Sequence, residues 1–201
     1  MLASPSSRAA AGADSVRIVG GRLRGRPIAG PKSQAIRPTS DQVREALFNV
    51  LLHRYSDPVT QARVLDLFAG TGALGLEALS READFSLFVD NAAEARALLR
   101  ANTEALGLGG RIRILRRDAT RLGRRSPALR AFSLVFLDPP YGCGLAERAL
   151  VSARSGDWIA PGALIVVEEA AEAEFGVPVG FDPLERRRYD ETELILMRNK
   201  P

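Results

Sequence analysis

The stretch DLFAGTGALG, residues 66–75, decides the fold of this chain. It follows an apolar run with strand character and opens a helical pattern, and Gly70, Gly72 and Gly75 fit the spacing GxGxxG. Glycines at this spacing allow a tight strand-to-helix turn and a close approach of the backbone to a ligand. Asp90 lies roughly 20 residues beyond the first glycine, where an acid can accept hydrogen bonds from a ribose. The stretch therefore predicts a loop that binds a nucleotide-like cofactor.

Strand and helix patterns alternate on both sides of this loop. Apolar runs favour strands at residues 63–68, 85–89, 112–115 and 132–137, and helical patterns cover residues 73–81, 92–106 and 145–155. Such alternation predicts a parallel sheet with right-handed crossovers and helices on both faces. Two later apolar runs, 163–167 and 193–198, are joined without a long helical pattern, which favours an antiparallel edge. The sequence thus predicts a Rossmann-like α/β fold, with a mostly parallel sheet and an antiparallel C-terminal edge.

The N-terminal residues differ in composition from the rest. Residues 1–15 are small and polar, so we expect a disordered tail, and a translation start at Val16 from a GTG codon is an alternative beginning. Residues 16–38 form a basic arm, in which glycines accompany six basic residues and no acid: Arg17, Arg22, Arg24, Arg26, Lys32 and Arg37. By composition this arm is as consistent with a solvated segment as with contact to RNA or DNA. Residues 39–201 form the predicted domain, which begins with a helix capped by Thr39 or Ser40.

Composition limits the class of protein. The chain has 201 residues, of which 46% are hydrophobic, enough to build the core of one domain. Its net charge of +4 is a weak indication of a polyanionic partner, so the placement of the basic residues matters more. The single cysteine, Cys143, excludes an internal disulfide, and no Cys/His cluster indicates a metal site. These features and the lack of a roughly 20-residue apolar run favour a protein of the reducing cytoplasm.

Three acids lie at the ends of three successive predicted strands. Asp66 ends the first strand, Asp90 the second, and Asp118 follows the third. The carboxyl ends of parallel strands line one crevice, where ligands of open α/β sheets bind. Asp66 would repel a pyrophosphate but attract a sulfonium or an α-amino group, which favours a methyl-donor cofactor over a nicotinamide. The only histidine, His53, precedes the cofactor loop, so no later histidine is available for hydride chemistry.

The fourth predicted strand runs directly into the tetrapeptide DPPY, residues 138–141. Its two prolines stiffen the turn and remove two backbone donors. The Asp138 carboxylate and the Pro139 carbonyl can accept the two N–H donors of an exocyclic base amine. Tyr141 offers a ring on which an extruded base can stack. The tetrapeptide therefore predicts the place where a nucleobase amine reacts.

The order DLFAGTG, FVD, RRDA, DPPY resembles the amino-group methyltransferases that use S-adenosylmethionine. Two further motifs, RIVGGRLRGR at 17–26 and RPTSDQVREALFNVL at 37–51, narrow the resemblance to the bacterial small-subunit ribosomal RNA methyltransferase D family. It extends from Arg17 to the C terminus. One departure is Tyr189-Asp190, where the family commonly has Tyr-Gly, and it concerns a local turn. The resemblance implies a class I S-adenosylmethionine-dependent methyltransferase that modifies the N2 amine of one guanine in 16S RNA, free or in an assembling small ribosomal subunit.

The resemblance also implies roles for individual residues. S-adenosylmethionine would be held by the strand ends and the glycine loop, with the ribose at Asp90 and the adenine at Asp118: Asp66, Phe68, Gly70, Gly72, Asp90, Asn91, Asp118 and Ala119. The base amine would meet the tetrapeptide of Asp138, Pro139, Pro140 and Tyr141. RNA would be bound by Arg22, Arg24, Arg26, Arg37 and Thr39. No metal and no covalent intermediate is implied, and Cys143 is read as a bystander.

Other functions remain open at this point. DPPY also serves the N6 amine of adenine in DNA methyltransferases, although the basic arm and RPTSDQVREALFN argue against that substrate. A protein-glutamine methyltransferase would carry NPPY, with an asparagine in place of Asp138. The glycine pattern also fits a nicotinamide-dependent oxidoreductase, and a non-catalytic RNA-binding relic is a further alternative.

Overall fold

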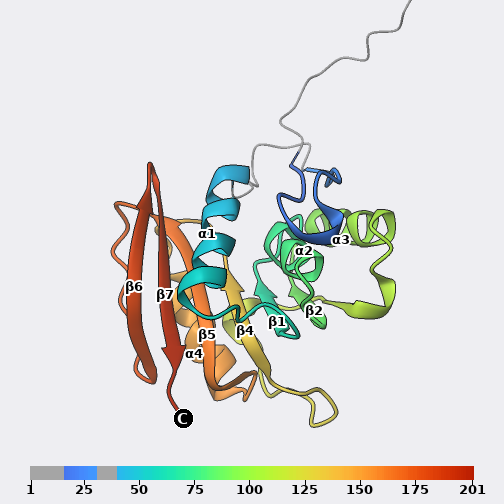
Figure 1. Cartoon of the computed structure of the whole chain (residues 1–201). Coiled ribbons are helices and arrows are strands. Elements are labelled where there is room, and N and C mark those ends of the chain that lie inside the picture. The colour runs from blue at the N-terminus through green and yellow to red at the C-terminus, as the bar shows by residue number, and fades with distance from the viewer. Residues whose placement is uncertain (1–15, 31–39) are drawn as a thin grey trace, which may run out of the picture.

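The fold is a seven-stranded mixed sheet with helices on both faces (Figure 1). A computed structural model describes residues 16–30 and 40–201. The strand order is β3-β2-β1-β4-β5-β7-β6, and the first five strands in this order are parallel. The prediction of a mostly parallel sheet with an antiparallel C-terminal edge is therefore confirmed. In the described part of the chain, no helix is long and apolar enough to span a membrane.

The strands agree closely with the apolar runs of the sequence. Their bounds are β1 Arg63–Leu67, β2 Phe85–Val89, β3 Ile112–Leu115, β4 Phe132–Leu137, β5 Ile159–Ala170, β6 Phe181–Tyr189 and β7 Thr192–Asn199. Each of the central strands β1, β2 and β4 has an almost uninterrupted run of buried residues. Strands that are covered on both faces need such continuous apolar sequence.

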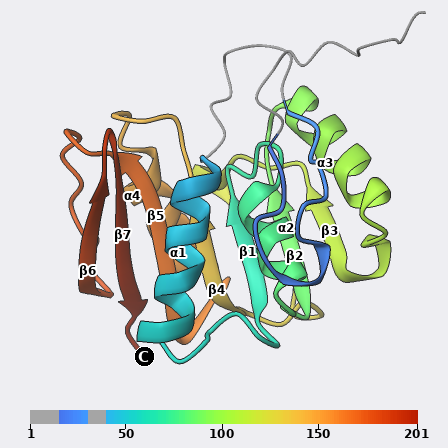
Figure 2. The ribbon, with the colours of Figure 1, turned by 45° about the horizontal axis from the view of Figure 1, so that its top comes forward.

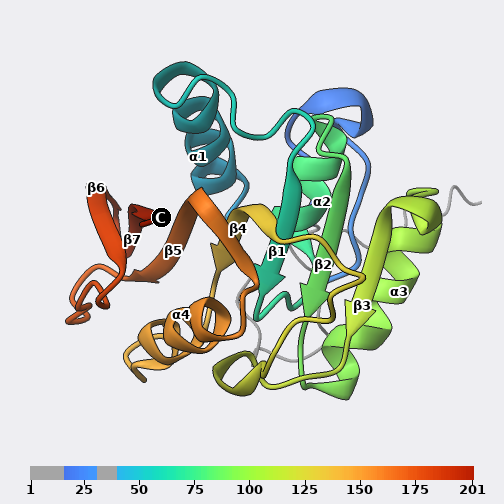
Figure 3. The same cartoon turned by 90° about the horizontal axis from the view of Figure 1, so that it is seen from below.

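Two helical layers enclose the sheet and create two cores. The helices are α1 Asp41–Arg54, α2 Ala73–Ser80, α3 Ala93–Ala105 and α4 Leu145–Ser155. Helices α1, α2 and α3 cover one face, whereas α4 covers the other (Figures 2 and 3). Alternate residues of β1 enter different cores, because Val64 packs with the first group of helices and Leu65 with α4. Ser40 caps α1 by accepting a hydrogen bond from the Val43 amide. It is one of the two residues that the sequence offered as the cap.

The C-terminal edge contains one strand that the sequence patterns did not indicate. β6 pairs only with β7, and it carries the charged run Glu185–Arg188, in which exposed and partly buried residues alternate. An edge strand needs few apolar residues, and charges there discourage pairing with other chains. A register shift lies between Pro183 and Glu185, the kind of irregularity at which proline is tolerated in a sheet. Asp190 in the β6–β7 turn has a φ of +49°, so it adopts the left-handed conformation for which the resembling family uses glycine.

Residues 16–30 of the basic arm are anchored to the domain beside α2 and α3 (Figure 2). Val16, Ile18 and Ile28 are buried in the same core as α1, α2 and α3. The Val19 amide donates to Glu77 on α2 at 2.8 Å, and the Ala29 amide donates to Asn102 on α3 at 2.7 Å. This part of the arm is therefore not the freely solvated segment that its composition allowed. Residues 1–15 and 31–39, including the remainder of the predicted arm, lie outside the described residues.

Candidate active site

The register of the sheet brings the predicted site residues to one edge. Leu67 of β1 pairs with Val89 of β2 and with Leu137 of β4. The residues that follow are Phe68, Asp90 and Asp138, so they leave three neighbouring strands at the same level. Their approach is also visible in the backbone, because the Asp138 amide donates to Leu67 O at 3.4 Å. The glycine loop and the tetrapeptide therefore lie next to each other at the carboxyl ends of the strands.

Asp66 is buried beneath the glycine loop. Its Oδ2 accepts a hydrogen bond at 3.0 Å from the amide of Gly75, in the first turn of α2. Burial, assisted by the negative charge of Asp90, raises the Asp66 pKa to about 8, although the Gly75 hydrogen bond opposes this shift. A carboxyl group in this state is ready to ionise when a cation approaches. Asp66 therefore shapes the loop and can also respond to a positively charged ligand.

The glycines of this loop are required by packing as well as by conformation. Gly72 has a φ of +83°, and a Cβ at this position would lie 2.5 Å from Leu99 Cδ2. At Gly75 a Cβ would meet the ring of Phe88 and would lie 2.9 Å from the Asp66 carboxylate. Both positions lie in a close-packed core, so a larger residue at either would displace buried neighbours.

Asp90 joins the second strand to the glycine loop. Its Oδ2 accepts from the Gly70 amide at 3.0 Å, and its Oδ1 accepts from the Ala92 amide at 2.8 Å. An ionised carboxylate has about four lone-pair sites, so each oxygen retains capacity for a further donor. The neighbouring Asn91 is exposed, and Phe68 is half-buried with a φ of +59°. The spacing between Gly70 and Asp90 noted in the sequence corresponds to a direct contact.

Asp118 begins a single-turn 3-10 helix, η3 (Ala119–Arg121). Its Oδ1 accepts from both the amide and the hydroxyl of Thr120 at 2.8 Å. These two hydrogen bonds lower the pKa of Asp118, so the side chain is ionised at neutral pH. Ala119 is buried. Both contacts go to one oxygen of the carboxylate, and an ionised carboxylate can accept further donors.

Two buried acids of β5, Glu168 and Glu169, hold the tetrapeptide and the glycine that follows it. The Tyr141 hydroxyl donates to Glu168 at 2.8 Å and lies 3.5 Å from the Thr192 hydroxyl, and the Gly142 amide donates to Glu169 at 2.9 Å. Burial and the charges of Glu168 and Asp138 raise the pKa of Tyr141, so it remains a neutral donor. Pro139 is buried, whereas Pro140 is exposed. Tyr141 and Gly142 thus connect the turn to two neighbouring acids of β5.

The chemistry of this edge fits S-adenosylmethionine. The cofactor carries a sulfonium, an ammonium, two ribose hydroxyls and an adenine amine, all of which are cations or hydrogen-bond donors. The edge offers complementary acceptors in Asp66, Asp90 and Asp118. Among the described residues no group of three or more His, Cys, Asp and Glu side chains could hold a metal ion.

Comparisons with known proteins agree with this geometry. Residues 16–198 match the model of a family described as conserved hypothetical protein 95. Ribosomal RNA small subunit methyltransferase D of Escherichia coli K12 is 38% identical over 167 residues, which cover 83% of this chain and 80% of that protein. This chain belongs to the ribosomal RNA small subunit methyltransferase D family. Membership confirms the predicted class of enzyme and decides against the nicotinamide-dependent oxidoreductase.

Solved structures place the family in the expected fold. The structure of yhhF from Escherichia coli has a TM-score of 0.77 and 32% identity, and the match covers 92% of this chain and 98% of that one. The 16S rRNA N2 G1207 methyltransferase of Thermus thermophilus, solved with AdoMet and guanosine, matches with a TM-score of 0.61 and 24% identity. That match covers 93% of this chain and 50% of the other, and it supports the fold alone.

The basic residues that the family resemblance assigned to RNA are only partly described. Arg22, Arg24 and Arg26 are exposed, and Arg26 also donates to the Ala105 carbonyl at 2.7 Å. Arg37 and Thr39 lie outside the described residues. The three described arginines therefore lie on an anchored part of the chain.

Sequence reasoning missed the residues that support the site from behind. Glu168 and Glu169 are each 3% exposed, and they follow the apolar run of β5 directly. Two consecutive acids at the end of a buried strand were a signal that could have been used. Asn102 gave no such signal, yet its side chain donates to the carbonyls of Ala29 and Thr71 and so connects the arm with the glycine loop.

Proposed function

We propose that this protein transfers a methyl group from S-adenosylmethionine to the exocyclic N2 amine of a guanine in 16S ribosomal RNA, in the cytoplasm. The observation that carries the proposal is the common level of Phe68, Asp90 and Asp138 at the edge of the sheet. This arrangement supports a role for Asp138 as the acceptor for a base amine next to the acids suited to the cofactor. The names of the relatives favour ribosomal RNA over DNA as the substrate.

S-adenosylmethionine, when bound, supplies an electrophilic methyl group. Asp90 is suited to accept the ribose hydroxyls, and Asp118 with the Ala119 backbone is suited to the adenine. The glycine loop and Asp66 would face the methionine part. Asp138 and the Pro139 carbonyl would accept the two N–H donors of the guanine amine, orient the nitrogen and balance the positive charge that develops on it.

The proposal is tested by nucleoside analysis of 16S RNA from a strain that lacks this gene. We expect loss of one N2-methylguanosine, which the purified protein restores in the presence of S-adenosylmethionine. Restoration on free RNA and on small-subunit particles from the strain would be compared, because either could be the substrate. An unchanged nucleoside pattern would refute the proposed function.

Asp90→Ala is expected to weaken binding of S-adenosylhomocysteine roughly ten- to hundredfold. The change removes a charged hydrogen-bond acceptor, which should cost about 1.5–3 kcal/mol of binding free energy. Calorimetric titration measures the effect. Because Asp90 also accepts from the Gly70 amide, the thermal midpoint should be recorded in parallel. Wild-type affinity in this variant would remove Asp90 from the cofactor site.

Cofactor binding is expected to release a proton near pH 7. Asp66 is protonated below its pKa of about 8, and a cation that faces it favours the carboxylate. Affinity for S-adenosylhomocysteine, whose amino group is cationic, should therefore rise between pH 6.5 and about 8 and then level off. Titrations in two buffers of different ionisation enthalpy report the release. Asp66→Asn should abolish it, and buffer-independent heats in the wild type would contradict the role.

Replacing Arg22, Arg24 and Arg26 together with glutamine is expected to weaken RNA binding and flatten its salt dependence. Each lost phosphate contact lowers the slope of log K against log salt by about 0.9 or less. Affinity for S-adenosylhomocysteine should stay unchanged, which serves as the control. A salt slope equal to that of the wild type would show that these arginines do not contact phosphates.

A further inference from the structure

The crossover between β3 and β4 is unusually basic. Residues 116–131, which join these two strands, contain six arginines and one acid, Asp118. This crossover passes over the face of the sheet that α4 only partly covers, and its only helical turn is the three-residue η3 (Figure 3). Long connections without regular structure are uncommon in compact domains and frequently functional. A surface this rich in arginine suits an anionic partner.

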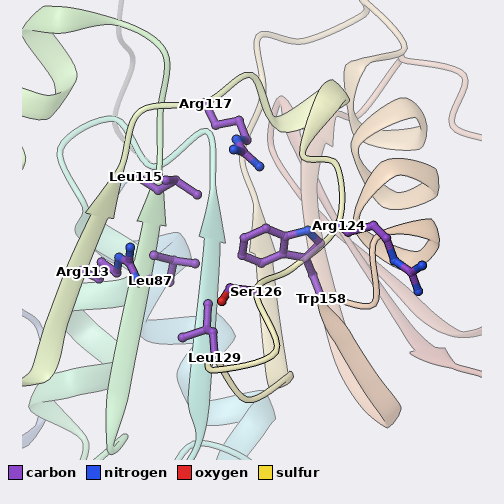
Figure 4. A pocket seen from close by; sticks show the side chains of 8 residues that line it. All are labelled: Leu87, Arg113, Leu115, Arg117, Arg124, Ser126, Leu129 and Trp158. Carbon is purple, nitrogen blue, oxygen red and sulfur yellow. The ribbon is translucent and has the colours of Figure 1, made fainter.

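A pocket of about 210 Å³ lies between this crossover and the sheet (Figure 4). Its floor is apolar, from Leu87, Leu115, Leu129 and Trp158. Three arginines, Arg113, Arg117 and Arg124, stand around this floor, and the lining includes Ser126 but no carboxylate. Arg113 pairs with Leu87 in the register of β2 and β3, so both side chains are on the same face of the sheet. The pocket contains none of the residues assigned to the cofactor or to the base amine.

The arginines in and beside the crossover differ in their contacts: some bind backbone carbonyls of the crossover, and others have weak contacts or none. Arg117 and Arg125 donate to backbone carbonyls of the crossover itself, at Leu122 and Leu129, and so hold its shape. Arg124 forms only a solvent-exposed ion pair with Asp157, in which the two side chains are 85% and 61% exposed. Such pairs contribute little and are easily exchanged for another anion. Arg113 and Arg116 are exposed. Neither forms a hydrogen bond or an ion pair with residues 16–30 or 40–201, so no such contact has to be broken before they bind an anion.

We propose that this pocket binds one unpaired nucleotide of the substrate RNA, apart from the nucleotide that is methylated. The base would lie on the apolar floor, while the phosphates on either side meet Arg113 and Arg124. Single-stranded RNA is bound in this way, by unstacked bases on apolar or guanidinium surfaces beside a basic track. A volume below that of drug-sized ligand pockets suits a single base. Arg117 directly precedes Asp118, so the pocket adjoins the cofactor edge. This inference rests on the proposed function, because it assumes an RNA substrate.

Two variants separate the charges from the pocket. Arg113→Gln with Arg124→Gln should reduce the salt slope of binding to unmethylated 16S RNA by one to two units, as expected for two lost phosphate contacts. Ser126→Phe fills the pocket without changing charge, and it should weaken binding about tenfold with the slope preserved. Arg198→Gln, on β7 at the far end of the sheet, removes the same charge as one of the first substitutions and should bind like the wild type.

Crosslinking provides a direct readout. RNA that contains 4-thiouridine should crosslink to peptides within residues 113–129 of the wild type, and Ser126→Phe should lose this crosslink. The inference is overturned if the wild type binds and methylates the RNA while both test variants match Arg198→Gln in affinity, slope and crosslinks. Failure of the wild type itself to bind or methylate the RNA would instead refute the proposed function.

Discussion

Asp138→Ala is expected to reduce the single-turnover rate of RNA methylation by about a hundredfold or more, at saturating S-adenosylmethionine and RNA. The guanine amine is a weak nucleophile because its lone pair is delocalised into the ring. A hydrogen bond from this amine to Asp138 strengthens as positive charge develops on nitrogen, so it stabilises the transition state more than the bound substrate. Removal of one such preorganised contact typically costs a hundredfold to a thousandfold.

Several contacts that hold the turn remain in this variant. The turn is held by the Asp138 amide to Leu67 O, by the Gly142 amide to Glu169 and by the Tyr141 hydroxyl to Glu168. None of these contacts uses the Asp138 side chain. Asp138→Asn keeps the shape and one neutral acceptor, so its rate should fall between those of the wild type and the alanine variant. A near-normal single-turnover rate for Asp138→Ala would show that the amine is accepted elsewhere.

The position of the acids near one edge of the sheet could be predicted because the fold follows from a one-dimensional pattern. Parallel strands end at the same edge, so the acids at the ends of β1, β2 and β3 were expected to lie near one another once the alternation of strands and helices was recognised. Gly70 and Asp90 show what the structure adds to the sequence pattern. Their spacing indicated a ribose site, and the structure adds that Gly70 donates directly to the acid.

The supporting residues could not be predicted in the same way, since their roles depend on contacts between distant segments. Glu168 supports Tyr141 across 27 residues, and Asn102 reaches Ala29 across 73. β6 was missed for a related reason. Its charged residues are stabilised by partners on neighbouring elements, such as the pairs Arg186–Glu193 and Arg54–Glu185, and a hydrophobic pattern does not register them.

Tyr141→Ala is expected to raise the Michaelis constant for RNA about five- to hundredfold, with little change in the rate at saturating RNA. The proposed role of Tyr141 is to stack on the extruded base, an interaction worth about 1–3 kcal/mol. The base ring stays aromatic during transfer, so stacking stabilises ground state and transition state alike and affects apparent affinity. Single-turnover assays across a range of RNA concentrations separate this effect from that of Asp138→Ala.

Tyr141→Phe distinguishes the ring from the hydroxyl. Phenylalanine retains the stacking surface but removes the hydrogen bond to Glu168, whose side chain is buried at 3% exposure. Loss of a donor to a buried carboxylate should lower the free energy of unfolding by about 1–3 kcal/mol, because a buried acceptor does not readily replace that hydrogen bond with one from water. The Michaelis constant for RNA should remain near that of the wild type. If Phe and Ala raised it equally, the hydroxyl and its support by Glu168 would be what RNA binding requires, and the stacking role would be wrong.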